Sequence, residues 1–178
     1  MADRKQIVLP TISSLTNVPT GLKYLTLPEG ILEIIEVACL MIAFVCVTAA
    51  PNKSPDESSY WHYQAATMGF GLVTVLIMIG YMTGVVHKIK IPWSVLEIVY
   101  CAAAGLLILT TGAHIAANTF GNAALIVATV FGFIAALAYI IQIFFAIRAW
   151  KRSIIADTLR MVEAERAQHT GATTDNSV

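Results

Sequence analysis

Hydrophobic positions gather into four long runs along the chain, at about residues 31–50, 64–86, 94–117 and 122–147. Each run has 20 residues or more and few charges. About 20 apolar residues in a helix cross the roughly 30 Å hydrocarbon core of a bilayer. We therefore predict membrane-spanning helices at about 27–50, 62–86, 93–117 and 122–150. The expected fold class is an all-α membrane protein, a four-helix transmembrane bundle.

Polar stretches flank these runs and divide the chain into three parts. Residues 1–23 form a polar N-terminal segment, 24–152 the four-helix domain, and 153–178 a tail. Apolar residues at near-helical spacing predict that the last helix continues into the tail as an amphipathic helix: Ile154, Ile155, Leu159, Met161 and Val162. The final ten residues lack such a pattern, and we expect them to be disordered.

Charge is scarce and unevenly placed. The chain is 57% hydrophobic and 12% charged, against the roughly 25% charge usual in soluble domains. Ten of the eleven Lys and Arg residues fall on one side if the chain crosses four times, and only Lys53 falls on the other. The positive-inside rule then places both termini and the 87–92 segment in the cytoplasm. Residues 1–30 lack the pattern of a cleavable signal, so helix 27–50 is the expected signal anchor.

Two similar segments place a glutamate at the same point of two spans. Residues 28–35 read PEGILEII and residues 92–99 read PWSVLEIV. The match indicates either two related hairpins or chance similarity between apolar helices. Glu33 and Glu97 lie about 7 Å past the proline that opens each helix, and Glu36 lies about 12 Å past it. Glu33 and Glu97 are thus expected near the cytoplasmic interface rather than at the midplane, and Glu36 lies one turn deeper.

The intramembrane carboxyls have competing interpretations. The spacings Thr26–Glu29 and Ser94–Glu97 match a capping box, which would make Glu97 a helix cap. Glu33 and Glu36 share one helix face and have no capping role. They are candidates for a polar contact between helices, or for a proton or ligand site, because carboxyls inside a bilayer are costly.

Three further polar positions are notable. His114, near the outer end of helix 93–117, is expected to be an interfacial hydrogen-bonding group. Gln142 is expected to hydrogen-bond between helices. Asn52 lies in a glycosylation sequon so close to the membrane that its use is left open.

Small residues recur at four-residue spacing in two of the helices. Helix 62–86 contains Gly80 and Gly84, and helix 122–150 contains Ala124, Ala128, Gly132 and Ala136. Small side chains let helices approach closely in lipid. These positions are expected to form a packing face, either within the monomer or toward a partner or second copy of the chain.

The sequence contains no motif for catalysis or for binding a cofactor. GxSxG, HExxH, the P-loop and the glycine-rich dinucleotide turn are all missing. No His or Cys pair has the spacing of a metal site. The three cysteines, Cys39, Cys46 and Cys101, lie inside predicted spans, so no extracellular disulfide framework is expected. We predict a protein that is not an enzyme, binds no cofactor, metal or nucleic acid, and contacts lipid and other membrane proteins.

Two segments resemble the MARVEL family of four-span membrane proteins. Residues 130–152, VFGFIAALAYIIQIFFAIRAWKR, resemble the fourth helix of its chemokine-like-factor branch. Residues 91–109, IPWSVLEIVYCAAAGLLIL, resemble the third helix of its MAL and plasmolipin-type branch. The resemblance covers about 24–152. The occludin and synaptophysin branches have longer outer loops with cysteines, which this chain lacks.

The resemblance implies a non-enzymatic organiser of membrane subdomains, membrane apposition or fusion, or vesicle traffic. We expect a multi-pass protein of the plasma membrane or trafficking vesicles that acts through lateral helix contacts. Two alternatives stay open: a small transporter or channel that uses Glu33 and His114, and a junction-adhesion protein.

Overall fold

The structure is a computed structural model that describes residues 21–51, 57–88, 93–119 and 121–174. The Asn52 sequon and residues 89–92 lie outside this part. The described elements are helical: the 3₁₀ helix η2 (Gly21–Thr26) and the α-helices α1 (Pro28–Ala49), α2 (Glu57–Thr83), α3 (Val85–Lys88), α4 (Trp93–Ala117) and α5 (Ala123–Thr174). Within this part of the chain, four helices are long and apolar enough to cross a membrane.

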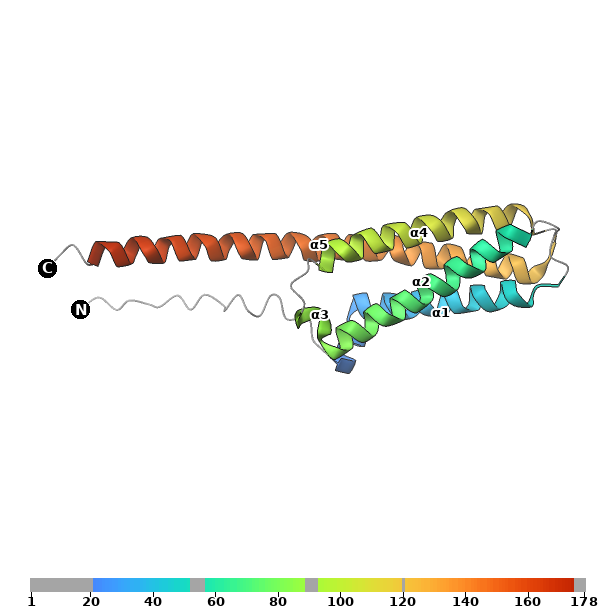
Figure 1. Cartoon of the computed structure of the whole chain (residues 1–178), viewed down its shortest axis with the longest axis horizontal. Helices are drawn as coiled ribbons and strands as arrows, with labels where there is room; N and C mark the ends of the chain where they lie inside the picture. The colour runs from blue at the N-terminus through green and yellow to red at the C-terminus, as the bar shows by residue number, and fades with distance from the viewer. Residues whose placement is uncertain (1–20, 52–56, 89–92, 120, 175–178) are drawn as a thin grey trace. The chain divides into compact units, whose positions relative to one another are not determined.

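The predicted four-helix bundle is confirmed. Residues 19–147 form one compact unit that contains η2, α1 to α4 and the first part of α5. Consecutive long helices run antiparallel, as Figure 1 shows for α1, α2, α4 and the start of α5. The remainder of α5, from Arg148, belongs to a second unit. The side of the membrane on which the termini lie remains a prediction.

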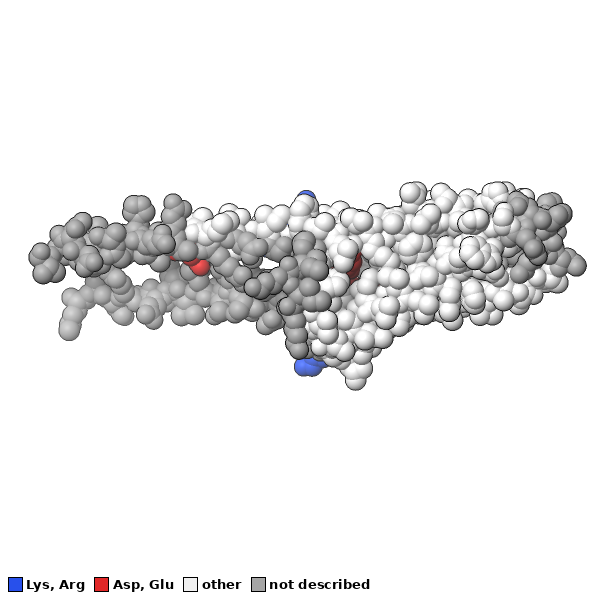
Figure 2. All heavy atoms as spheres, viewed as in Figure 1, with Lys and Arg blue, Asp and Glu red and all other residues white. Residues whose placement is uncertain are grey.

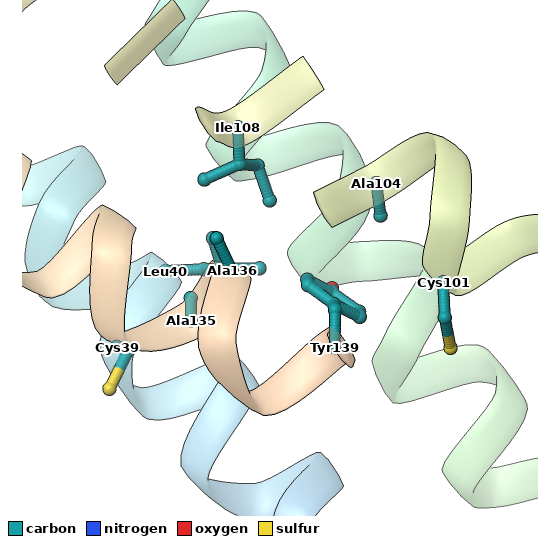
Figure 3. Close-up of a cluster of buried hydrophobic side chains, with 8 residues drawn as sticks. All are labelled: Cys39, Leu40, Cys101, Ala104, Ile108, Ala135, Ala136 and Tyr139. Atoms are coloured by element: carbon teal, nitrogen blue, oxygen red, sulfur yellow. The ribbon is translucent and has the colours of Figure 1, made fainter. Parts of the chain in front are cut away.

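Among the described residues, three clusters of buried apolar side chains form the core of the 19–147 unit, and the smallest of them is Tyr24, Tyr81 and Val86. The first joins α1, α4 and α5 (Figure 3): Cys39, Leu40, Cys101, Ala104, Ile108, Ala135, Ala136 and Tyr139. The second joins all four long helices: Ala43, Val47, Ala50, Tyr60, Tyr63, Ile115, Leu125 and Ala128. Alanine and cysteine supply five of the eight residues of the first cluster, in line with the close van der Waals packing that stabilises helices in lipid.

Large aliphatic side chains cover the outside of the long helices. Among them Leu76, Val99, Leu106 and Leu137 are 60% exposed or more. Figure 2 shows few charged side chains among the described residues on that face. Large apolar side chains on the outer surface are expected for a protein that is surrounded by lipid.

Local sequence explains where α2 ends but not how α1 begins. Gly84 has a φ of +70°, a conformation that glycine adopts readily, and α2 ends one residue before it. The predicted capping box at Thr26–Glu29 is wrong. The N-cap of α1 is Leu27, without a side-chain cap, and the Thr26 hydroxyl donates to the carbonyl of Lys23 instead.

Candidate functional site

Three carboxyl groups gather at one end of the 19–147 unit. We call this the η2 end, because η2, the first turns of α1 and α4 and the last turns of α2 meet there. Glu33 and Glu36 stand one turn apart on α1, and both are 0% exposed. α4 contributes Glu97, which is half-buried. The three side chains, here named the acid cluster, lie close enough to interact electrostatically.

Glu97 is held by hydrogen bonds from two other helices. The Tyr81 hydroxyl of α2 donates to Glu97 Oε2 at 2.9 Å, and Gln142 Nε2 of α5 donates to Oε1 at 3.1 Å. Glu97 therefore joins three helices. Its interpretation as a helix cap is wrong, because α4 begins at Trp93 and Ser94 lies inside the helix. Gln142 makes the kind of inter-helix bond expected for it.

η2 closes this end of the bundle with a buried tyrosine. The Tyr24 ring stacks on Tyr81 with centroids 4.9 Å apart and planes at 14°. Its hydroxyl faces the Glu33 carboxyl without hydrogen-bond geometry. Burial, and then the adjacent Glu33, raises the pKa of Tyr24 well above its usual value, so the phenol keeps its proton. A Cβ on Gly30 would collide with the Tyr24 carbonyl oxygen, so this close approach requires glycine.

A second polar network lies next to the acid cluster along the same helices. Thr74 Oγ1 is 2.8 Å from the Tyr100 hydroxyl and 2.9 Å from the Tyr139 hydroxyl. Tyr100 also donates to the Phe70 carbonyl at 2.9 Å. The network links α2, α4 and α5. Its hydroxyls have partners within the chain, so it is structural rather than a free binding site.

The predicted small-residue face of α5 lies inside the 19–147 unit. Ala128, Gly132 and Ala136 are buried. The Tyr63 hydroxyl of α2 donates to the Ala128 carbonyl at 2.7 Å, and a Cβ on Gly132 would collide with that hydroxyl. Ala124 is half-buried against the second core cluster. Packing between helices of one molecule accounts for the small size of these residues.

The glycine pair of α2 does not form a helical stripe. Gly80 lies within α2, where an added Cβ would stand 3.3 Å from a methyl group of Val86. Gly84 is outside the helix, in the turn before α3. The pair shapes the end of α2 rather than a helix face.

His114 lies at the opposite end of the unit from the acid cluster. It is exposed in the last turn of α4 and lines a shallow hollow with Thr110, Thr111 and His62. His62 Nδ1 donates to the Ser58 carbonyl at 2.6 Å. The structure therefore does not bring His114 and Glu33 together. Within the described ranges, no group of three His, Cys, Asp or Glu side chains is arranged to hold a metal ion.

The architecture and the comparison with known families point the same way. A family model described as a membrane-associating domain, MARVEL, matches residues 24–145, more than half of the chain. The chain belongs to the MARVEL family. No solved structure matches it.

The MARVEL domain contains the whole acid cluster, together with Tyr24, Tyr81 and Gln142. Members of the family are generally non-enzymatic membrane proteins, in line with the hydrogen-bonding and packing roles of the buried polar groups. The chain is thus a multi-pass integral membrane protein in contact with lipid. Its likeness to the chemokine-like-factor, MAL and plasmolipin branches stays a prediction.

Sequence reasoning missed the tyrosines of the site. Tyr81, Tyr100 and Tyr139 each stand inside an apolar helix, where a phenol must find a hydrogen-bond partner. The sequence could therefore have indicated that these three tyrosines form hydrogen bonds inside the bundle. Tyr24 carried no comparable signal, because it lies before the first predicted helix, at 27–50.

Proposed function

We propose that this MARVEL protein organises the membrane around it, by lateral contacts with membrane proteins and by recruiting partners to its tail. It would act in the plasma membrane or in trafficking vesicles. Its activity there would support the formation of membrane subdomains, the apposition or fusion of membranes, or vesicle traffic. One observation carries the proposal: α5 is far longer than a membrane span and bears exposed apolar side chains beyond it.

Because α5 is longer than a membrane span, part of the helix extends beyond the bilayer. The helix has 52 residues, and about 20 suffice to cross the hydrocarbon core. The basic residues Lys151 and Arg152, both exposed, mark the expected inner interface. Residues beyond them are available to the cytosol.

Apolar side chains recur on one side of this segment. Ile155, Leu159 and Val162 stand at i, i+4 and i+7 and are 60%, 49% and 44% exposed. This spacing is the one by which an amphipathic helix docks onto another apolar surface. We name these three residues the tail stripe and propose that it binds an apolar groove or helix of a cytosolic partner.

Proximity labelling from an enzyme fused after Val178 tests the proposal in native cells. We compare the wild type with a stripe variant, I155Q/L159Q/V162Q, and with a control, T158Q/E163Q, whose positions are exposed and polar and lie beyond the expected inner interface. The wild type and control should label both membrane and cytosolic proteins. The stripe variant should lose the cytosolic set and keep the membrane set.

Two results would contradict the proposal. An unchanged cytosolic set in the stripe variant would remove the tail stripe as a binding surface. A wild-type set without enriched membrane proteins would argue against lateral organisation.

A further inference from the structure

The η2 end holds more buried hydrogen-bond acceptors than donors. Both carboxyl oxygens of Glu33, both of Glu36 and the Oε1 atom of Gln142 are buried and have no hydrogen-bond partner in the described structure. Among the described residues, only two buried donors at this end are also unpaired, the Tyr24 hydroxyl and the Trp93 indole N–H. Five acceptors therefore face two donors.

Two of the unpaired groups come from outside the carboxyl pair and point into the cluster. Tyr24 is 2% exposed and its hydroxyl faces Glu33. Gln142 is 3% exposed, and its amide is fixed in the cluster by the bond from Nε2 to Glu97. Buried polar groups in folded proteins almost always have partners, so this concentration of unpaired atoms calls for a ligand.

Among the described residues, no positive charge accompanies the carboxyl pair. No described Lys, Arg or His forms an ion pair with Glu33 or Glu36. The described titratable groups that interact with the pair are all acids: Tyr24 of η2, Glu29 and Cys39 of α1, Tyr81 of α2, Glu97, Tyr100 and Cys101 of α4, and Tyr139 of α5. A buried carboxylate without a cation is strongly disfavoured, and such groups become neutral.

Protons would resolve the imbalance. A carboxylic acid offers one O–H donor and keeps an acceptor oxygen. One proton on Glu33 and one on Glu36 change five acceptors and two donors into three acceptors and four donors. Water molecules can then bridge those groups that do not touch directly.

Glu97 differs from the pair in its partners. Its two oxygens each accept a hydrogen bond, from Tyr81 and from Gln142, and it is only half-buried. Donated hydrogen bonds favour the charged form of a carboxyl group. The three acids thus divide into one carboxyl group with two donors and two that lack them.

We propose that Glu33 and Glu36 form a proton-binding site, in which each carries a proton at neutral pH and bound water joins them to Tyr24 and Gln142. Glu97 is the member of the cluster whose two oxygens already have donors. Protons on Glu33 and Glu36 remove two of the three negative charges that the acid cluster would otherwise carry. The proposal does not depend on the proposed organising function.

Infrared spectroscopy of the purified full-length protein tests the site directly. The detergent is chosen without ester groups, so that the carbonyl stretch of protonated carboxylic acids is visible. At neutral pH the wild type should show this band, and it should shift in D₂O. E33Q and E36Q should each lose part of the band and the double variant should lose both parts, whereas E97Q should keep both.

Glutamine mimics a neutral acid in shape, so E33Q/E36Q should fold as the wild type does. Loss of folding in this variant would contradict the proposal, since it would show that a negative charge is needed there. Absence of the acid band at neutral pH in the wild type would overturn the proposal. So would its loss in E97Q alone, which would move the proton to Glu97.

Discussion

At the scale of single residues, what a carboxyl group does here depends on the donors around it. Glu33 and Glu97 occupy matching positions near the start of two spans, yet only Glu97 receives hydrogen bonds, from Tyr81 and Gln142. Glu36 adds a second buried acid without a donor. The cluster therefore combines one carboxyl group held by two donors with two groups whose burial favours bound protons.

Two bound protons make the stability of the domain depend on pH. The folded state holds protons that glutamates of the unfolded state release above about pH 4.3. Stability should therefore fall as pH rises above that value, by up to about 1.4 kcal/mol per pH unit for each proton, until the folded site also releases them. Thermal unfolding in detergent, followed by circular dichroism across pH, measures this effect.

The E33Q/E36Q variant is the control for this prediction. Its two amides do not titrate, so its unfolding temperature should change with pH clearly less than that of the wild type. An equal slope in both proteins would assign the pH dependence to other groups.

At the scale of elements, the long helices could be predicted from the sequence and the short ones could not. Apolar runs of bilayer length determine α1, α2, α4 and α5, because each must satisfy its backbone bonds internally. η2 is stabilised by tertiary contacts of Tyr24, which local sequence does not contain. α2 ends at Thr83 because Gly84 adopts a positive φ. The sequence did not indicate this end, because the spacing of Gly80 and Gly84 also fits a helix-packing motif.

The candidate site shows the same limit. The carboxyls and Gln142 stand out in an apolar sequence, so their polar role was predictable. The sequence did not indicate which carboxyl group has partners. The donors Tyr81 and Gln142 lie on other helices, 16 and 45 residues from Glu97 along the chain. Ser94 and Glu97 also have the spacing of a capping box, and this spacing led to the wrong interpretation of Glu97 as a helix cap.

The contact between α2 and α5 at Gly132 gives a test of helix packing. G132A should destabilise the fold by about 1–3 kcal/mol, because the added methyl group would displace the Tyr63 hydroxyl from the Ala128 carbonyl. The measurement is a denaturation curve in mixed micelles.

Gly69 provides the matched control within α2. A Cβ there meets nothing within 4 Å, so G69A should be neutral or should stabilise the helix by up to about 1 kcal/mol. If both alanine variants were equally stable, the close approach of Tyr63 to Gly132 would not matter energetically.

At the scale of the whole molecule, the number of spans determines which ends share a side of the membrane. Four helices have the length and composition of membrane spans, so an even number of crossings is expected. Segments before α1 and after the fourth span should then share one compartment. The start of α2 should face the other.

Cysteine labelling tests this arrangement in sealed cells or vesicles. L22C and M161C lie at exposed positions before the first span and after the fourth, and W61C lies at an exposed position at the start of α2. A membrane-impermeant maleimide should label L22C and M161C only after the membrane is permeabilised, and W61C beforehand. Labelling of all three from one side would exclude four crossings.

The hydrogen bonds of Glu97 also bear on how the protein is made. A chain enters the membrane from its N-terminus, so Tyr81 precedes Glu97 into the bilayer, whereas Gln142 is synthesised 45 residues after it. During that interval α4 holds an acid with only one of its two donors. Ribosomes halted before residue 142 should therefore leave a helix that insertion chaperones and membrane quality control still recognise as unfinished.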